Sequence, residues 1–370
     1  DAAARELIVA MAPDDRAALL EEVPAGVARR LVQLLGPAER DATLDLLGYD
    51  ADTVGRRMTP DFVDLPDWLT AGEALVRIRR VARNRETVYY TYVIDGARRL
   101  KGVVSLKDLV MAEPDQKIAD IMEPNPIVAR TATDQEDAAH TMQEYDLLAL
   151  PVVDLEGRLV GVLTWDDMAD IMEREVTEDV YRYGAVQGLE RTYFRLSIPG
   201  VALRRVVWLF LLVLVNTVTG TIIAHETDLL EEVAILAAFI PLLIGTGGNV
   251  GAQSSTVIIR GLATEDIRPS QAVKVISREV AIGVLLGVIL GAIVVLWAWW
   301  LGRDLRVGII VGSTLSIVTA VAALTGGGLP FAFRRFKVDP AMVSAPLVTT
   351  VMDIVGVTIY FAVTHLILSL

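Results

Sequence analysis

Asp353 is the residue whose chemistry most restricts its surroundings, because it is the only acidic residue in the apolar stretch 344–370. An ionised carboxylate near the middle of a bilayer costs about 2.5 to 3.5 kcal/mol on insertion scales, so it requires a partner or a water-filled path. Two interpretations of Asp353 therefore stay open. It is either hydrogen-bonded to a neighbouring helix, or it lines a path along which cations pass.

A second feature is a dense run of acids in the first half of the chain. Residues 134–179 contain 14 acids and only two bases, Arg158 and Arg174. Like charges at this density repel one another unless cations screen or bridge them. The run is either a solvated face or a site for bound cations, and its densest part holds Asp167, Asp170, Glu175, Glu178 and Asp179.

A third feature is the stretch FIPLLIGTGGNVGAQSSTVIIRGLAT at 239–264, which contains more small and polar residues than a lipid-facing helix tolerates. Glycines such as Gly247 and Gly248 let helices approach closely, and they can expose carbonyl oxygens to a water-filled path. Asn249 is the best candidate among the polar side chains. Tight helix packing by small residues is the alternative interpretation of the glycines.

These residues must be positioned by membrane helices. The runs 206–224, 233–259, 280–302 and 307–333 contain no charged residue, and 340–370 contains only Asp353. Each run reaches the roughly 20 residues that a helix needs to cross hydrocarbon. Eleven bases flank these runs on one side, whereas the opposite loops hold only Arg303 and Arg306. The positive-inside rule then predicts a cytoplasmic N-terminus and a C-terminus outside.

The composition agrees with a chain made of two unlike regions. Apolar residues make up 53% of the 370 positions and charged residues 22%, which suits neither a soluble protein nor a chain that is membrane throughout. Residues 1–199 hold 37 of the 47 acids and 23 of the 34 bases, so the acidity belongs to the first half. With no cysteine and three histidines, any metal here is expected to be bound by oxygen.

The acidic half contains a short repeat. The segment RLKGVVSLKDLV at 99–110 returns as RLVGVLTWDDMA at 158–169, which aligns Gly102 with Gly161 and Asp108 with Asp167. Each copy is predicted to form a short helix, two strands joined by a turn, and a further helix. The pattern resembles a tandem pair of CBS domains. Before it, residues 1–50 show three short helical patterns that open near prolines.

The polar stretch at 239–264, the segment VDPAMVSAPLVTTVMD at 338–353 and the CBS pair together resemble the MgtE family of magnesium channels and transporters. The resemblance covers nearly the whole chain. It implies a multi-domain architecture: a short all-α N-terminal domain over 1–50, an α/β CBS pair over 51–175 (51–115 and 116–175), a connecting helix over 176–198, and an all-α membrane domain over 199–370. We expect the five spans at 201–224, 230–259, 275–302, 306–333 and 343–369.

The resemblance also implies where ions bind. In the family the matching Asp lines the ion path at the interface of a homodimer, and hydrated ions contact carbonyls at positions matching Pro346 and Thr349. Ala345 stands where the family often has Asn. Besides the five acids above, positions matching Asp134, Glu136, Asp146 and Asp339 are implied as ligands of regulatory Mg²⁺, which closes the pore when cytoplasmic magnesium is plentiful.

CBS pairs often bind adenine nucleotides, and MgtE relatives include members that bind ATP. Tyr90 and Asp108 match positions used for this, with Asp108 suited to ribose hydroxyls. Lys107 and Leu147 differ from the Arg and Phe expected there. The resemblance thus implies an ATP site in which two of the expected residues are replaced.

We therefore expect a homodimeric Mg²⁺ channel of the plasma membrane, without enzymatic activity or a nucleic-acid partner. An ion-coupled carrier of divalent cations is one alternative, in which Asp353 relays protons. A membrane-anchored nucleotide or metal sensor without transport is another. No Walker loop or nucleophile elbow is present, and GTGGNVG at 245–251 lies inside a predicted span rather than after a strand. Selectivity among Mg²⁺, Mn²⁺, Co²⁺ and Ca²⁺ does not follow from the sequence.

Overall fold

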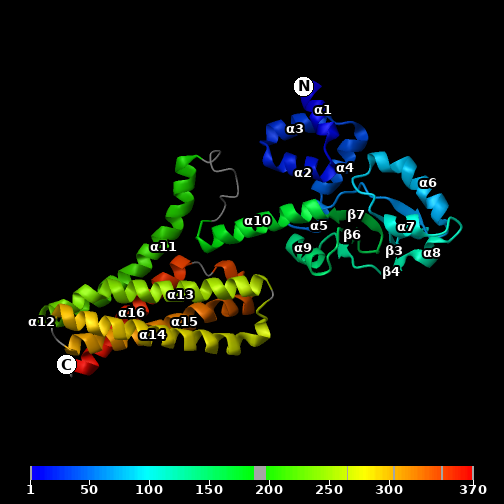
Figure 1. The fold of residues 1–370 in the computed structure, drawn as a ribbon. Helices are drawn as coiled ribbons and strands as arrows, with labels where there is room; N and C mark the ends of the chain where they lie inside the picture. Colours follow the sequence, from blue (N-terminus) through cyan, green and yellow to red (C-terminus); the bar gives the residue numbers. More distant parts are fainter. Residues whose placement is uncertain (1, 187–196, 265, 303–304, 343–344, 369–370) are drawn as a thin grey trace. The chain divides into compact units, whose positions relative to one another are not determined.

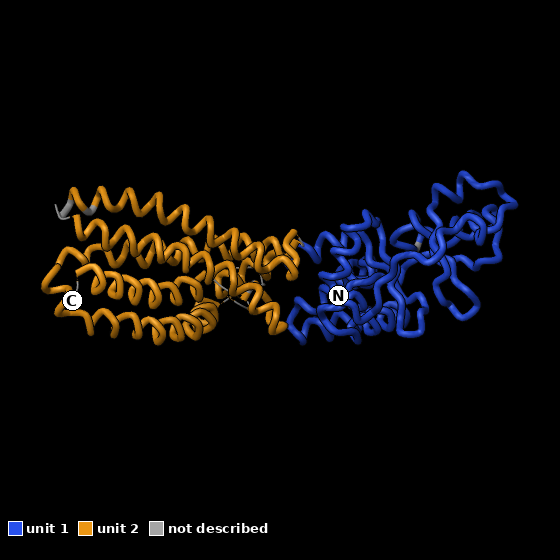
Figure 2. Tube along the Cα trace, turned by 90° about the horizontal axis from the view of Figure 1, so that it is seen from below, with its two compact units in different colours: residues 1–175 blue, residues 176–370 orange. Residues whose placement is uncertain are grey.

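The computed structural model describes residues 2–186, 197–264, 266–302, 305–342 and 345–368 (Figure 1). The chain divides into two compact units, residues 1–175 and residues 176–370 (Figure 2). The first is the mixed α/β part and the second is helical, as the expected multi-domain architecture requires.

The chain begins with four short helices, α1 (Ala2–Ala10), α2 (Pro13–Glu22), α3 (Ala25–Leu34) and α4 (Pro37–Leu47). Proline stands at the first helical position of α2 and α4 and at the N-cap of α3, where its missing N–H costs no hydrogen bond. The buried Arg16 of α2 donates from Nε to Thr43 Oγ1 of α4 at 3.1 Å. The predicted stack of short helices is confirmed.

Two repeats of the same topology follow, each built around a small sheet. The first contains α5 (Val54–Arg57), β1 (Asp64–Pro66), α6 (Ala71–Val81), η1 (Ala82–Asn84), β2 (Tyr90–Ile94), β3 (Leu100–Ser105) and α7 (Leu106–Met111). The second contains α8 (Ile118–Ile121), β4 (Glu123–Pro124), β5 (Ala129–Arg130), α9 (Gln135–Glu144), β6 (Ala149–Val153), β7 (Leu159–Thr164) and α10 (Trp165–Tyr183). In both repeats a parallel pair of strands is extended by an antiparallel pair, with a bulge at the equivalent place.

The two repeats exchange their opening segments. β4, which opens the second repeat, pairs with β3 of the first, and Thr59, which opens the first, exchanges backbone hydrogen bonds of 2.8 and 2.9 Å with Val162 on β7. Gly102 and Gly161 lie where these segments cross, and a Cβ at either position would lie within 3.0 Å of the crossing backbone. The aligned glycines of the repeat are therefore explained by close backbone approach.

Each repeat buries its own apolar core. The core of the first repeat includes Leu65, Val93, Val104 and Leu109. The core of the second reaches the N-terminal helices, because Ala17 of α2 and Leu46 of α4 pack with Leu150 and Met142. The N-terminal helices and the second repeat therefore share one core.

α10 differs from its predicted extent. It runs without interruption from the second repeat to Tyr183 and ends there, whereas the sequence predicted a connecting helix up to residue 198. Gly184 and Ala185 form a turn, and Ala185 adopts a left-handed φ of 54° that ends the helix. The rest of the predicted connecting helix, residues 187–196, lies outside the described residues.

Among its described residues, the second unit contains five helices that are long and apolar enough to cross a membrane. They are α11 (Ile198–His225), α13 (Ile240–Ala263), α14 (Ala272–Gly302), α15 (Leu305–Arg335) and α16 (Ala345–Leu368). The shorter elements α12 (Thr227–Glu232), η3 (Ala234–Phe239), η4 (Pro269–Gln271) and η5 (Pro340–Met342) connect them. The prediction of five apolar helices in this region is confirmed.

α15 is the central helix of this unit, because α13, α14 and α16 all pack against it, while α11 packs against α16. Gly326 of α15 meets the backbone of Gly251 on α13, and no side chain fits between them. Between α14 and α15, Gly291 and Gly312 approach each other in the same way. Small residues let these helices pack closely in an apolar solvent, where burial of apolar side chains provides little driving force.

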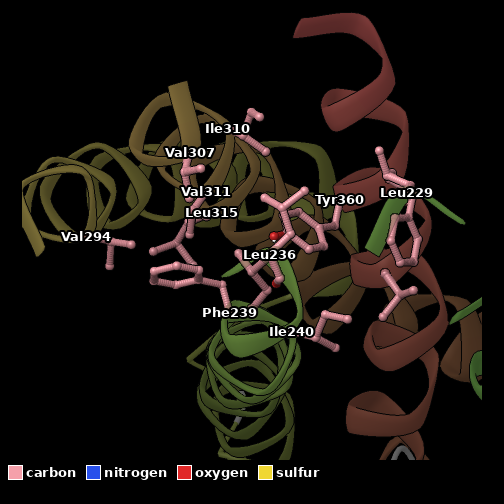
Figure 3. Close-up of a cluster of buried hydrophobic side chains, with 13 residues drawn as sticks. Leu229, Leu236, Phe239, Ile240, Val294, Val307, Ile310, Val311, Leu315 and Tyr360 are labelled. Atoms are coloured by element: carbon pink, nitrogen blue, oxygen red, sulfur yellow. Dashed lines mark hydrogen bonds between the residues drawn. The ribbon is translucent and has the colours of Figure 1, made fainter. Parts of the chain in front are cut away.

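A cluster of large apolar side chains packs the end of the unit formed by α12 and η3 (Figure 3). Tyr360 of α16 lies within it, 1% exposed, and donates from its hydroxyl to the Leu236 carbonyl at 2.9 Å. Phe239 packs edge-on against Trp297. The cluster fixes η3 against the membrane helices and so determines where α13 begins.

Candidate functional site

The predicted pore carboxylate lies in the middle of α16. Asp353 is half-buried, and its Oδ1 atom is buried without a hydrogen-bond partner among the described residues. A buried carboxylate oxygen that stays unpaired costs free energy. The interpretation of Asp353 as a residue tied up by a neighbouring helix therefore has no hydrogen bond to support it in this part of the chain.

One face of α16 carries Pro346, Thr349 and Asp353, because residues three and four apart in a helix lie one above the other. Thr349 donates from Oγ1 to the Ala345 carbonyl at 2.9 Å, and the Pro346 carbonyl accepts from the Thr350 hydroxyl at the same distance. Both threonine hydroxyls bond to their own helix, so the oxygens of this face remain able to accept hydrogen bonds from water.

The glycines of α13 face α16 and α15. A Cβ at Gly248 would lie 2.8 Å from Thr349 Cγ2, and a Cβ at Gly247 would lie 2.7 Å from Val318 Cγ1. Both glycines are buried, and close packing against α15 and α16 accounts for their small size. Asn249 lies on a different face of α13 and is exposed. The structure thus brings Gly248 to Thr349, and no hydrogen bond joins Asn249 to Asp353 among the described residues.

A group of carboxylates gathers in the first unit. Ligand oxygens of Asp14 on α2, Glu86 after η1 and Asp167 on α10 all lie within 4.8 Å of one another. Asp14 is only 6% exposed, and its Oδ1 has no hydrogen-bond partner among the described residues. Asp167 accepts a short hydrogen bond from Thr164 Oγ1. No ion pair to a base offsets the three charges within the described chain, and three oxygen donors suit Mg²⁺ or Ca²⁺.

The electrostatics of this carboxylate cluster favour protons or a cation. Burial, followed by the charges of Asp167 and Glu86, raises the pKa of Asp14 from 3.8 to about 8. Burial also raises the pKa of Glu86 from 4.5 to about 7, although a hydrogen bond from Thr59 opposes the rise. Burial raises the pKa of Asp167 to about 6, and the Thr164 hydrogen bond opposes it. Near neutral pH the cluster therefore binds protons unless a cation replaces them.

Asp14 and Glu86 are not among the sequence-predicted ligands. Asp14 belongs to the pair Asp14 and Asp15 after Pro13, which is typical of a helix N-terminus, and Glu86 is an isolated acid in a basic segment. Neither pattern indicates a metal site. Only the contacts that α2 and the first repeat make with the second repeat bring them to Asp167.

Comparison with known proteins bears on both sites. The profile of a family described as divalent cation transporter matches residues 240–363, which include Asp353. Profiles of the MgtE intracellular N domain and of the CBS domain match residues 1–52 and 118–174. A Thermus thermophilus protein named magnesium transporter MgtE is 43% identical over 95% of this chain and 78% of the relative. This chain belongs to the MgtE family.

Other members of the MgtE family are also similar to this chain. A Bacillus subtilis magnesium transporter MgtE is 36% identical over 95% of this chain and 77% of its own. Among solved structures, the cytosolic domain of the Mg²⁺ channel MgtE in complex with ATP is 43% identical, with a TM-score of 0.45 over 45% of this chain and 69% of that one. The soluble part of a magnesium transporter is 34% identical, with a TM-score of 0.45, and covers 46% of this chain and 67% of that one.

The other acids matched to MgtE positions are distributed over both ends of α9 and along α10. Asp134 caps α9 by accepting from the Glu136 amide at 2.8 Å, and Glu136 lies 3.6 Å from His140. Glu175 accepts from Gln135 Nε2 at 2.6 Å. These acids lie near the N-terminus of α9, whereas Asp146 is exposed at its other end and Asp170 is exposed on α10. Of these predicted ligands, only Asp167 belongs to a group of carboxylates that lie close enough to hold one metal ion among the described residues.

In the second unit a base lies among three of the predicted ligands. Arg182 forms ion pairs with Glu178, one turn earlier, and with Asp339 before α16. Asp179 lies in the same turn of α10 and is half-buried. Arg182 thus pairs with Glu178 and Asp339, two of the acids that the resemblance implies as ligands of regulatory Mg²⁺.

The predicted nucleotide residues lie on the first repeat. Tyr90 begins β2, and Asp108 lies in the first turn of α7, where its Oδ2 accepts from Ser105 Oγ at 2.5 Å. Thr164 and Asp167 form the equivalent pair in the second repeat. Asp108 is exposed, whereas Asp14 covers Asp167. Within the first unit, the N-terminal helices cover one of the two equivalent positions and leave the other open.

Proposed function

We propose that this MgtE-family chain conducts Mg²⁺ across the plasma membrane as a homodimer. The observation that carries the proposal is the buried, unpaired carboxylate oxygen of Asp353, in the middle of a helix that can span the membrane. The names of its relatives, magnesium transporter MgtE, support Mg²⁺ as the ion.

The chemistry of Mg²⁺ suits such a site. The ion dehydrates reluctantly and prefers octahedral oxygen, so it commonly keeps several waters and uses one or two carboxylates. Two Asp353 residues, one from each protomer, would accept hydrogen bonds from the waters of a hydrated ion and neutralise its charge. The oxygens of Pro346 and Thr349 on the same face of α16 would extend the path.

A decisive experiment compares magnesium uptake by Asp353→Asn and the original chain in liposomes that contain a magnesium-sensitive dye. We expect Asp353→Asn to remove uptake, since it deletes the charge with little change in volume. Asp228→Asn, which removes an exposed acid in α12, should leave uptake unchanged. Uptake by Asp353→Asn at the original rate would refute the assignment of the pore.

An ion-coupled carrier remains the second candidate, because an unpaired carboxylate inside a span also suits a proton relay. The two mechanisms differ in their need for a gradient. A channel carries Mg²⁺ current with no proton or sodium gradient present, whereas a coupled carrier does not. Recordings with symmetrical pH and no sodium distinguish them, and competing Mn²⁺, Co²⁺ and Ca²⁺ in the same recordings measure selectivity.

Regulation by cytoplasmic Mg²⁺ belongs to the same proposal. Asp14, Glu86 and Asp167 are the ligand set that the distances support, and α10 connects Asp167 to residues 176–183 of the second unit. Mg²⁺ that prefers the compact arrangement of the N-terminal helices on the CBS pair would stabilise that arrangement by its differential affinity. Such binding would close the pore when magnesium is plentiful.

The open position of the first repeat is the candidate site for ATP. Asp108 would bind ribose hydroxyls and Tyr90 would contact the base. The cytosolic domain of the Mg²⁺ channel MgtE has been solved in complex with ATP, which supports this ligand class. We further propose that the C-terminus lies outside the cell, because five spans follow an intracellular N domain.

A further inference from the structure

A cavity of about 560 Å³ lies between α13, α14 and the corner that joins them. Asp353 does not line it. One stripe of its lining on α14 repeats at intervals of four residues, Lys274, Arg278, Ile282 and Leu286, and Val275, Glu279 and Gly283 line the cavity beside it. The stripe is charged at the start of the helix and apolar further along it, over about 18 Å.

The corner at the charged end is fixed by local hydrogen bonds. The Ile267 amide donates to the Gly261 carbonyl at 2.8 Å, and Ile267 packs so closely on Gly261 that no side chain fits there. Thr264 Oγ1 donates to Asp266 Oδ2 at 3.1 Å. The Arg268 amide donates to Gln271 Oε1 at the same distance. These contacts hold the corner in place, so the cavity is a formed feature of the unit.

The charged end offers both signs. Lys274 and Arg278 line it together with Asp266 and Glu279, and no ion pair joins these bases to these acids within the described residues. The stem of Glu279 packs beside Gly327 of α15, and Glu279 is half-buried. A ligand with one anionic and one cationic group would satisfy both pairs.

The apolar end is formed by Val250 and Val257 of α13 with Ile282 and Leu286 of α14. Because an intracellular domain precedes the first span, the corner between α13 and α14 lies at the cytoplasmic face of the membrane. Charges at the level of the headgroups and apolar side chains at the level of the hydrocarbon match an amphiphile that lies along the membrane normal. A soluble anion would leave the apolar end unused.

We propose that this cavity binds a zwitterionic phospholipid with a primary ammonium group, of the phosphatidylethanolamine type. The phosphate pairs with Lys274 and Arg278, and the ammonium donates hydrogen bonds to Asp266 and Glu279. The first part of one acyl chain follows Ile282 and Leu286, and the rest of the lipid stays in the bilayer. Basic pockets between membrane helices at the cytoplasmic face are known to bind phospholipid headgroups.

The test measures lipid binding to the full chain purified in detergent, by native mass spectrometry and by thermal unfolding. Phosphatidylethanolamine, phosphatidylcholine and phosphatidylglycerol with identical acyl chains are compared. Phosphatidylcholine cannot donate hydrogen bonds from its trimethylated nitrogen, and phosphatidylglycerol has no cationic group. We expect phosphatidylethanolamine to bind about tenfold more tightly than either, a difference of about 1.4 kcal/mol.

Substitutions of the lining residues test whether the lipid binds in this cavity. Lys274→Gln combined with Arg278→Gln should remove the preference for phosphatidylethanolamine, and Glu279→Gln alone should make phosphatidylethanolamine and phosphatidylcholine equivalent. Arg335→Gln, which removes an exposed base in the last turn of α15 outside the cavity, should leave the preference intact. The proposal is overturned if phosphatidylglycerol or phosphatidylcholine binds as tightly as phosphatidylethanolamine, or if the cavity variants keep the preference. The assay needs no ion transport, so its outcome is independent of the proposed function.

Discussion

At the scale of single residues, the proposed binding of Mg²⁺ by Asp14, Glu86 and Asp167 would compete with protons for the same carboxylates. Raised pKa values mean that the folded state holds protons that the unfolded state has released, so without metal the stability of the folded unit falls as pH rises. The loss extends from about pH 4, near the usual carboxyl pKa, to about pH 8, the raised pKa of Asp14. Mg²⁺ binds the ionised form and should restore the stability at the upper end of this range.

The corresponding experiment follows thermal unfolding of the full chain between pH 5.5 and 8.5, with EDTA or with Mg²⁺. We expect Mg²⁺ to raise the unfolding temperature strongly at pH 8.5 and weakly at pH 5.5, because protons compete for the same oxygens. Equal stabilisation at the two pH values would contradict the assignment of these carboxylates as ligands.

A pair of neighbouring substitutions tests the same cluster. Asp14→Asn should weaken the regulatory Mg²⁺ response about tenfold, or by about 1.4 kcal/mol, since it removes a ligand charge from the centre of the cluster. It should also stabilise the metal-free protein, because it relieves repulsion. Asp15→Asn is the control, since Asp15 is exposed and lies outside the cluster. Equal effects of the two changes on Mg²⁺-dependent closing in electrical recordings would exclude a specific role for Asp14.

The residues differ in how well the sequence predicts them. Asp353 is identifiable because a charge in an apolar run is costly whatever surrounds it, and the structure leaves one of its oxygens unpaired. Asp14 and Glu86 are not identifiable, because their role depends on a contact between distant segments. Glu178 and Asp339 are predicted as metal ligands, but the sequence does not indicate that Arg182 forms an ion pair with both of them.

At the scale of helices, the crossing of α13 and α15 depends on Gly326. Gly326→Ala would place a methyl group against the Gly251 carbonyl, so the helices must separate, and overpacking of this kind costs about 1 to 3 kcal/mol. Gly328→Ala is the matched control, since nothing lies within 4 Å of a Cβ added there. Thermal unfolding in detergent measures the stability of the two variants. A similar loss in the two variants would attribute the effect to helix propensity or to the method rather than to the crossing.

The last turn of α10 is attached to the membrane helices by a second contact besides Arg182. Tyr183 donates from its hydroxyl to the Ala252 carbonyl of α13 at 3.0 Å and lies 2.6 Å from Thr256 Oγ1. Tyr183→Phe removes this contact, worth about 1 kcal/mol. If α10 conveys closure, the variant should need more Mg²⁺ to close. Tyr181→Phe, for which no such contact to α13 is described, should not. Identical closing in the two variants would show that this contact does not couple α10 to the pore.

Most helices and strands are predictable from the sequence, because apolar periodicity and prolines specify them locally. The end of α10 is not, since helical periodicity continues beyond Tyr183 while Gly184 and Ala185 turn the chain. The bulges that β2 and β6 share, and the crossing at Gly102 and Gly161, also depend on contacts between repeats. The aligned glycines were visible in the sequence, but the crossing segments were not.

At the scale of the whole molecule, the absence of cysteine from the chain allows a direct test of the proposed homodimer. Asn249 is exposed on α13, next to Gly248, which packs on Thr349 of α16, so in a dimer with Asp353 at its interface Asn249 is expected to meet its counterpart. Asn249→Cys should therefore form a disulfide between protomers in membranes. Val288→Cys, on an exposed and apolar face of α14, should remain monomeric on a non-reducing gel. Cross-linking of both or of neither would contradict this arrangement.

The exchange of opening segments between the CBS repeats has a consequence for the history of the fold. A lone repeat would present an unpaired strand edge, at β3 or at β7, and such edges promote association with other chains. An ancestor with one repeat would thus have been completed by a second copy of itself. A gene duplication that joined two such copies would account for the tandem repeat, and the glycine at each crossing leaves room for the covering segment.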